Sequence, residues 1–238
     1  MTRESVLFSA DEVMGVLGGR KTQFRRVVKP QPDQNAEEGG VMFTSNGFMR
    51  VRASRGRNAR AAGRLNFHNF SCPYGQPGDS LWVKETFGCG RDFYPHYTYV
   101  YRVDFPTPDD LDGIRAEAGD DWRWQSSVHM PKQASRITLV VLSVRVQRLQ
   151  AITDEDAVAE GATRRGDLWS MDWSKCGSWS RYASASPIKG KDYARLVEAD
   201  VGLGSARFAF ANYWDKINGK RLPWSSNPFV WAIGFKRM

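Results

Sequence analysis

The stretch "SVLFSADEVMGVLGGRKTQFRRVV" (residues 5–28) sets the start of the fold. Its first part, "SVLFS", is typical of a short strand. "ADEVMGVLGG" has apolar residues at helical spacing and stops at Gly18 and Gly19, so it predicts a capped helix. "RKTQFRRVV" therefore begins an extended segment that follows a helix.

The same stretch contains part of a phosphate-binding loop motif. Gly15, Lys21 and Thr22 stand at the spacing of G-x-x-x-x-G-K-[ST]. Arg20, however, occupies the position where a glycine lets the backbone wrap a phosphate, and such a loop leaves a strand and opens a helix. Here the order is reversed, which argues against a nucleoside triphosphatase.

Strand patterns and Gly/Pro turns recur along the rest of the chain. In "CPYGQPGDSLWVKETF", two turns lead into a predicted strand at residues 81–87, and the alternating "YTYVYRVD" predicts another. "SRITLVVLSVRVQRLQ" is long enough for one strand or a bent pair, and "NPFVWAIGFKRM" predicts the last strand. We therefore expect a mostly antiparallel sheet.

Two further segments predict helices. "TDEDAVAEGA" has Thr153 as N-cap, acids in its first turn and Gly161 past its end, and "ARFAFANYWDKING" is stopped by Gly219. Many short strands with few helices predict an α+β fold, a small closed β-barrel with helical decoration. Since the chain has no internal repeat and no long linker, we expect one domain over residues 1–238 with insertions at about 31–70, 105–127 and 163–205.

Composition narrows the class of protein. The 238 residues are 41% apolar, which suffices for a core, and no apolar run approaches the roughly 18 residues of a membrane span. There is no signal-peptide pattern, so we expect a cytoplasmic protein without membrane partners. Cys72, Cys89 and Cys176 are scattered, and adding His68 gives only a loose ligand set, so we expect no metal and no cofactor. No particular oligomeric state is indicated.

The net charge of +8 and the pI of 9.5 favour a polyanionic partner. Six arginines fall within residues 50–64, where there is no acidic residue: Arg50, Arg52, Arg55, Arg57, Arg60 and Arg64. This run is either a solvated loop or, with the phenylalanines that flank it, a surface for single-stranded nucleic acid. In the second interpretation, Arg52, Arg55, Arg57 and Arg60 contact RNA.

Six pieces in this order carry a family resemblance: the first helix with "GGRKTQFRR" and "VVKPQP", "CPYGQPGDSLWVKETF", "YRVD", "HMPKQASRITLVVLSVRVQRL", "ITDEDAVAEGA", and "YWDKINGK" with "NPFVWAIGFKR". The chain resembles the ASCH domains, relatives of the PUA barrel, and specifically their longer members encoded by phages and prophages. The resemblance implies a barrel whose pocket or cleft binds RNA, nucleotides or modified bases.

Some small members of that family are amidohydrolases that remove an acyl group from N4 of cytidine. They use a lysine, a threonine three residues later and a glutamate, and the resemblance places the lysine at Lys21 and the glutamate at Glu160. The threonine position holds Phe24, whose ring has no oxygen to attack an amide. If this site lost its nucleophile, Phe24→Thr should gain hydrolysis that depends on Lys21 and Glu160.

The residues themselves leave alternatives open. Lys21 and Glu160 form either a base and proton relay or a plain salt bridge between the first loop and a helix. Thr22 is the nearest hydroxyl, but neighbours on a regular strand point to opposite faces, so it shares the pocket with Lys21 only if the strand bulges. Phe24 is either a core residue or a stacking platform for a base.

Further binding residues follow from the same segments. Arg25 and Arg26 are either phosphate contacts at the pocket mouth or surface charges. The resembling segments also contain four residues that we expect along the cleft: Trp82, Lys84, Ser135 and Arg136. The sequence thus favours a protein that binds RNA or a modified nucleoside. The alternatives are an N4-acylcytidine amidohydrolase and a phage assembly or structural protein.

Overall fold

The computed structural model describes residues 3–32, 41–43, 48–52, 67–88, 99–105, 123–165, 168–171 and 205–238. Its main sheet has five strands in the order β1-β6-β9-β12-β2. Their bounds are β1 (Arg3–Leu7), β6 (Ser80–Lys84), β9 (Thr138–Arg148), β12 (Phe229–Arg237) and β2 (Gln23–Val27). Only β1 and β6 pair in parallel, so the expected mostly antiparallel sheet is confirmed.

The sheet is open in the part of the chain that the structure describes. β1 and β2 are its two edges, and no pairing joins them among the described strands. The chain passes from one edge to the other through helix α1 (Ala10–Leu17), which places these sequential strands at opposite ends of the order. The α+β class therefore holds, whereas the expected closed barrel is not seen in these pairings.

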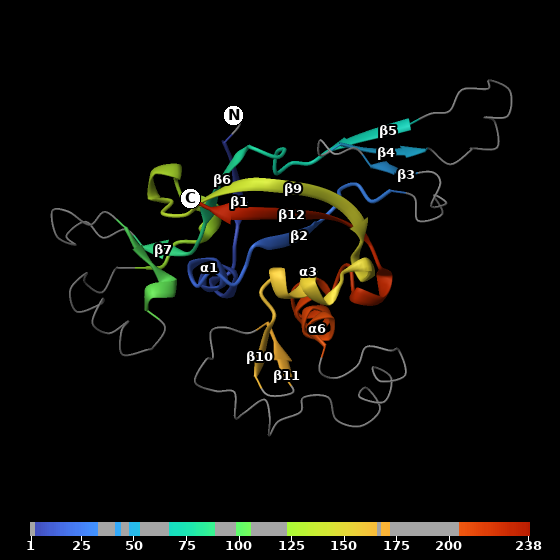
Figure 1. The fold of residues 1–238 in the computed structure, drawn as a ribbon. Coiled ribbons are helices and arrows are strands. Elements are labelled where there is room, and N and C mark those ends of the chain that lie inside the picture. The colour runs from blue at the N-terminus through green and yellow to red at the C-terminus, as the bar shows by residue number, and fades with distance from the viewer. Residues whose placement is uncertain are drawn as a thin grey trace, which may run out of the picture.

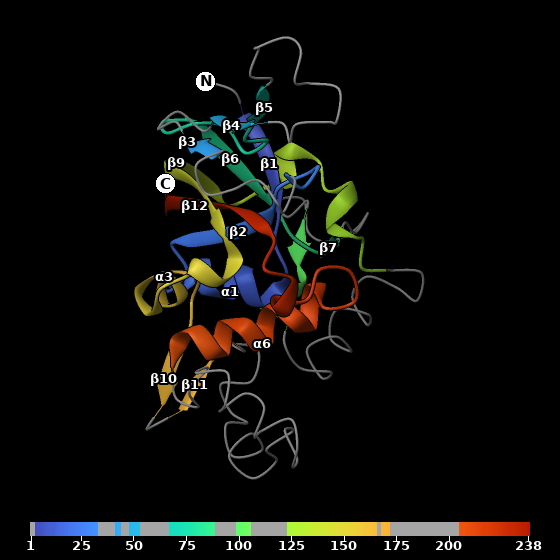
Figure 2. The same cartoon turned by 90° about the vertical axis from the view of Figure 1, so that its right-hand side faces the viewer.

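The three predicted helices are present and begin where their caps indicate. Ser9 caps α1 through a reciprocal capping box with Glu12. Thr153 caps α3 (Asp154–Ala159), and Ser205 caps α6 (Ala206–Asn218). Figures 1 and 2 both show the three helices on the same side of the sheet, beyond β2.

Two hydrophobic clusters join these layers. The larger one lies between the sheet and α1 and includes Val13, Phe24 and Ile233. The smaller one, with Phe210 and Trp214, packs α6 against α3 and the start of β12. Together they fix the position of β2 relative to the end of α3, where the charged site described below is built.

Several local elements differ from the expectations. The described part of "YTYVYRVD", residues 99–104, contains the short β8 (Val100–Tyr101), which pairs with β7 (Phe87–Gly88). The chain then turns into the 3-10 helix η3 (Arg102–Asp104). The other 3-10 helices are η4 (Ser127–His129), η5 (Lys132–Ala134), η6 (Leu149–Ala151) and η7 (Trp224–Ser226).

Strands also occur inside two predicted insertions. β3 (Val41–Phe43), β4 (Phe48–Arg52) and β5 (Phe67–Ser71) form an antiparallel sheet, and β10 (Thr163–Arg165) pairs with β11 (Leu168–Ser170). The arginines that alternate along β4 favoured a loop, yet an alternating polar face is also compatible with a strand. The division into one domain with three insertions stays a prediction.

Candidate functional site

Lys21 and Glu160 meet as a buried ion pair between the loop after α1 and the C-cap of α3. Lys21 Nζ donates to Glu160 Oε2 at 2.9 Å and to the Glu160 carbonyl oxygen at 3.0 Å. Only 1% of the Lys21 side chain and 3% of the Glu160 side chain are exposed. The tertiary structure therefore brings these two residues together, but it covers both of them.

A second cation occupies the other oxygen of the same carboxylate. Arg25 Nη1 donates to Glu160 Oε1 at 2.9 Å, and Arg25 Nη2 donates to Asp156 Oδ2 at 2.7 Å. Arg145 also donates to Asp156. The Arg25 side chain is fully buried, so the interpretation of Arg25 as a surface charge is wrong: this residue ties β2 to α3.

Glu12 adds a third carboxylate on the α1 side. Its Oε1 lies 3.2 Å from Arg26 Nη1 and 3.9 Å from Lys21 Nζ. Burial alone would raise the pKa of Glu12, but the charges of Arg26 and Lys21 outweigh it and hold that pKa below its ordinary value. Sequence reasoning missed Glu12 and Asp156 because each had a sufficient local role, in the capping box and in the first turn of α3.

This network predicts an acid-labile fold. The pKa values of Glu12 and Asp156 are both lowered in the folded state, for Asp156 because Arg145 and Arg25 outweigh burial. A lowered pKa stabilises the fold above the unfolded pKa, and this contribution is lost as the pH falls through the folded pKa. We expect urea denaturation to show stability falling below about pH 4.5. Glu12→Gln keeps a residue that can complete the capping box. In this variant the free energy of unfolding should fall less as the pH is lowered. The same fall as in the native protein would contradict the role of Glu12.

Phe24 lies in the hydrophobic core, and Thr22 lies at the surface. The Phe24 ring is fully buried, with edge contacts to Phe8 and Tyr74 and the Arg26 guanidinium 5.3 Å from its centroid. Phe24 is thus a core residue, not an open stacking platform. Thr22 is exposed while Lys21 is buried, and the backbone N–H of Thr22 donates to the Ala159 carbonyl oxygen. The expectation that Thr22 and Lys21 face opposite ways agrees with the structure.

Three of the other predicted cleft residues make local contacts near η4 and η5. Lys84 Nζ donates to the Val128 carbonyl oxygen and lies 5.0 Å from the centroid of the Trp82 ring. Ser135 Oγ donates to the Val83 carbonyl oxygen at 2.9 Å. None of these side chains lines either of the two cavities described below. Strands β9 and β12 separate β6 from β2 in the sheet. That these residues line a binding cleft stays a prediction.

Arg136 belongs to a separate charged cluster. Its guanidinium donates to both oxygens of Glu85 at 2.9 Å and to Asp104, and it lies 4.0 Å from the centroid of the Tyr101 ring. Burial raises the pKa of Glu85 despite this partner. Through these ion pairs Arg136, just before β9, links Glu85 to Asp104 of η3, and it lines neither cavity. Its expected place along a cleft stays a prediction.

The structure describes only the first part of the arginine-rich run. Arg52 ends β4, whereas Arg55, Arg57 and Arg60 lie outside the described residues. Its contact with RNA stays a prediction.

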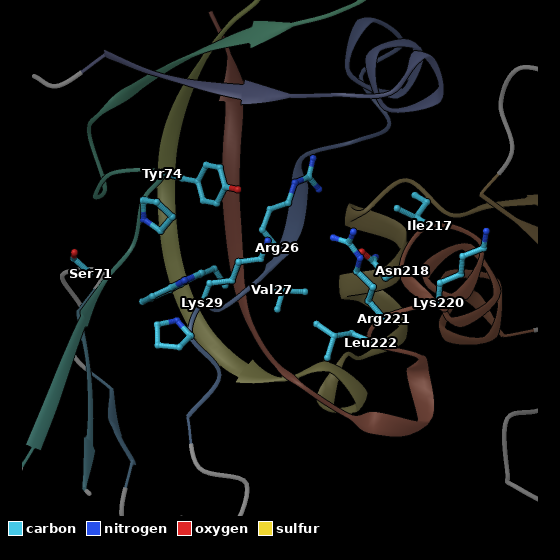
Figure 3. A pocket seen from close by; sticks show the side chains of 13 residues that line it. Arg26, Val27, Lys29, Ser71, Tyr74, Ile217, Asn218, Lys220, Arg221 and Leu222 are labelled. Carbon is cyan, nitrogen blue, oxygen red and sulfur yellow. The ribbon is translucent and has the colours of Figure 1, made fainter. Parts of the chain in front are cut away.

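A basic cleft of about 820 Å³ opens beside β2 (Figure 3). Four cationic residues line it: Arg26, Lys29, Lys220 and Arg221. Tyr74 and Lys29 stand on one side, and Lys220 and Arg221, from the chain just after α6, stand on the other. No acidic residue is among the described residues that line this cleft. Of the predicted binding residues whose side chains the structure describes, only Arg26 lies here.

A smaller cavity of about 330 Å³, here called the narrow cavity, adjoins the basic cleft. The two share Arg26, Val27, Ile217 and Asn218 among their lining residues. Glu12, Arg25, Arg26 and Glu160 form the charged part of its wall. Lys21 is not among the lining residues, so the ion pair contributes its carboxylate to this cavity and not its amine.

Sequence reasoning missed most of the basic cleft. Lys29 and Lys220 lie in pieces that carry the family resemblance and Arg221 directly follows one, but none of the three was assigned a binding role. Within the described part of the chain, no group of three or more His, Cys, Asp or Glu side chains is arranged to hold a metal ion. None of the helices there is long and apolar enough to cross a membrane.

Comparison with models of protein families, with curated proteins and with solved structures found no match. The class of protein therefore rests on the fold and the cavities themselves. In its described residues this is an α+β protein with an open five-stranded sheet, helices α1, α3 and α6 on one side of it, and a basic cleft at its β2 edge.

Proposed function

We propose that the protein binds single-stranded RNA in the basic cleft. The observation that carries this proposal is the positive charge of the residues that line the cleft. Four of the described lining residues are cationic, and none of them is acidic. Backbone phosphates are the partners that such a surface attracts, and a net charge of +8 adds long-range attraction for a polyanion. The Lys29, Lys220 and Arg221 side chains are exposed and therefore accessible to phosphate.

The shape of the site favours a single strand. The cations lie in a cleft with Tyr74 on one wall, and an aromatic ring beside backbone-binding cations suits unpaired bases, which can stack. The proposal includes the resemblance to ASCH domains and PUA-like barrels. It also includes a cytoplasmic location, where RNA is available. A modified nucleoside remains within the same ligand class.

The hydrolase alternative has less support. Lys21 and Glu160 are within hydrogen-bonding distance, but they are buried in an ion pair, and the residue at the nucleophile position is in the core. Nothing in this geometry presents a hydroxyl beside a free base. A purely structural phage protein would leave a cleft lined with cations unexplained.

The test is the salt dependence of RNA binding. We expect the affinity for single-stranded RNA, measured by fluorescence anisotropy, to fall steeply with salt. Replacing Lys29, Lys220 and Arg221 by Gln should reduce the slope of log K against log [salt] by about 2, since each phosphate contact on a single strand contributes about 0.7. A matched control replaces three exposed cations outside both cavities: Lys132, Lys236 and Arg237.

Two outcomes separate the possible surfaces. If the cleft variant keeps the native slope while the control loses it, the cleft is not the binding surface. A further variant, with Gln at positions 52, 55, 57 and 60, reports on the arginine-rich run by itself. A loss confined to that variant would place RNA on the run and overturn the cleft proposal.

A further inference from the structure

The basic cleft and the narrow cavity differ in charge although they share a wall. In the narrow cavity, the two carboxylates of Glu12 and Glu160 face two guanidinium groups, those of Arg25 and Arg26, so its lining carries no net charge. Apart from Arg26, which is paired with Glu12, the basic cleft carries three positive charges, those of Lys29, Lys220 and Arg221. A ligand that fills both therefore has a neutral, polar part and an anionic part.

The walls of the narrow cavity suit a flat, uncharged group. Phe210, Tyr213 and Trp214 line it, and Leu7 and Ile217 add apolar side chains that are 46% and 55% exposed. Its volume of about 330 Å³ is at the lower end of the range for ligand pockets. A single heterocyclic base fits such walls better than an aliphatic chain does, because the polar part of the lining also needs partners.

Arg25 has one buried hydrogen-bond donor without a partner among the described residues. Its two Nη atoms donate to Glu160 and Asp156, but its Nε is buried and has no hydrogen-bond partner within the described residues. Its guanidinium lies 5.6 Å from the centroid of the Phe210 ring, on the wall of the narrow cavity. A buried donor without an acceptor is costly, and a ligand atom is one way to satisfy it.

We propose that one nucleotide spans both cavities, which rests on the proposed RNA-binding function. Its base enters the narrow cavity, where a ring nitrogen or carbonyl oxygen of the base accepts from Arg25 Nε. Its phosphate lies in the basic cleft near Lys220 and Arg221. The shared wall at Ile217 and Asn218 is where the sugar passes from one cavity to the other. The site thus reads one extruded base of a single strand.

Competition measures the two parts of the ligand separately. Each ribonucleoside 5′-monophosphate, the matching nucleoside and inorganic phosphate are titrated against a fluorescent single-stranded RNA bound to the native protein. We expect the best mononucleotide to compete at least about tenfold better than its nucleoside or phosphate alone, because only it fills both cavities. Equal competition by inorganic phosphate and by all four mononucleotides would overturn the inference.

Substitution at the shared wall tests the geometry. Ile217 is 55% exposed, so Ile217→Trp should fold and fill the passage between the cavities. We expect mononucleotide binding to weaken by about tenfold while RNA binding keeps its salt dependence. Leu142→Trp is the control, since Leu142 is 54% exposed and lines neither cavity. Equal affinity in both variants would contradict the spanning ligand.

Arg25→Lys removes the Nε donor and keeps the charge. It should reduce the preference for the mononucleotide over phosphate, and Ile217→Trp remains the test if this buried substitution unfolds the chain.

The outcomes also separate the two proposals. If RNA does not bind, the proposed function fails. If RNA binds with a steep salt slope and an abasic strand binds equally well, only the nucleotide-spanning site fails.

Discussion

Glu160→Gln should lower the free energy of unfolding by about 3–5 kcal/mol, which is the usual cost of breaking a buried ion pair from one side. The Glu160 carboxylate accepts from Lys21 on one oxygen and from Arg25 on the other. All three side chains are at most 3% exposed. Removing the negative charge leaves two buried cations with insufficient compensation, because a neutral amide cannot replace it.

Chemical denaturation of matched variants measures this effect. Glu155→Gln changes a neighbouring, exposed glutamate on the same helix and should leave the denaturation midpoint nearly unchanged. A double-mutant cycle with Lys21→Met gives the coupling free energy between Lys21 and Glu160. Neutralising both partners should lower the free energy of unfolding by less than the sum of the two single substitutions. If Glu160→Gln unfolds at the same midpoint as Glu155→Gln, the ion-pair network does not hold α3 to β2.

Phe24→Thr should destabilise the protein by about 3–5 kcal/mol, the range for removing a buried aromatic side chain. The ring is fully buried and packs against Phe8, Tyr74 and Phe235. Threonine leaves a cavity there and buries a hydroxyl without an assigned partner. Phe24→Leu, which keeps most of the apolar volume, should cost clearly less in the same thermal or urea denaturation experiment.

The same variant tests the hydrolase alternative. The family resemblance alone predicted that Phe24→Thr would gain activity with Lys21 as base. The structure changes this expectation, because Lys21 Nζ is held by Glu160 and the side chain at position 24 faces the core. We expect neither the native protein nor the variant to hydrolyse N4-acetylcytidine, monitored by chromatography of the nucleoside. Rapid hydrolysis by the native protein would overturn the binding proposal in favour of an amidohydrolase.

The elements that local sequence patterns define were the most predictable. The caps at Ser9, Thr153 and Ser205 begin α1, α3 and α6, and Gly161 ends α3 with a φ of 108°, which glycine adopts without strain. Alternation and β-branched residues likewise placed β9 and β12. These features depend on hydrogen bonds and side-chain periodicity over a few residues, so the sequence by itself determines them.

Juxtapositions of distant segments required the tertiary structure. Lys21 and Glu160 are 139 positions apart, and sequence patterns alone did not show that Arg25 and Glu12 share their network. The basic cleft is likewise built from Lys29 before the arginine-rich run and from Lys220 and Arg221 after α6. Exposed lysines and arginines satisfy no local pattern, because water solvates them in any arrangement. Only the packing of α6 against α3 and of β2 against β12 decides that their charges converge.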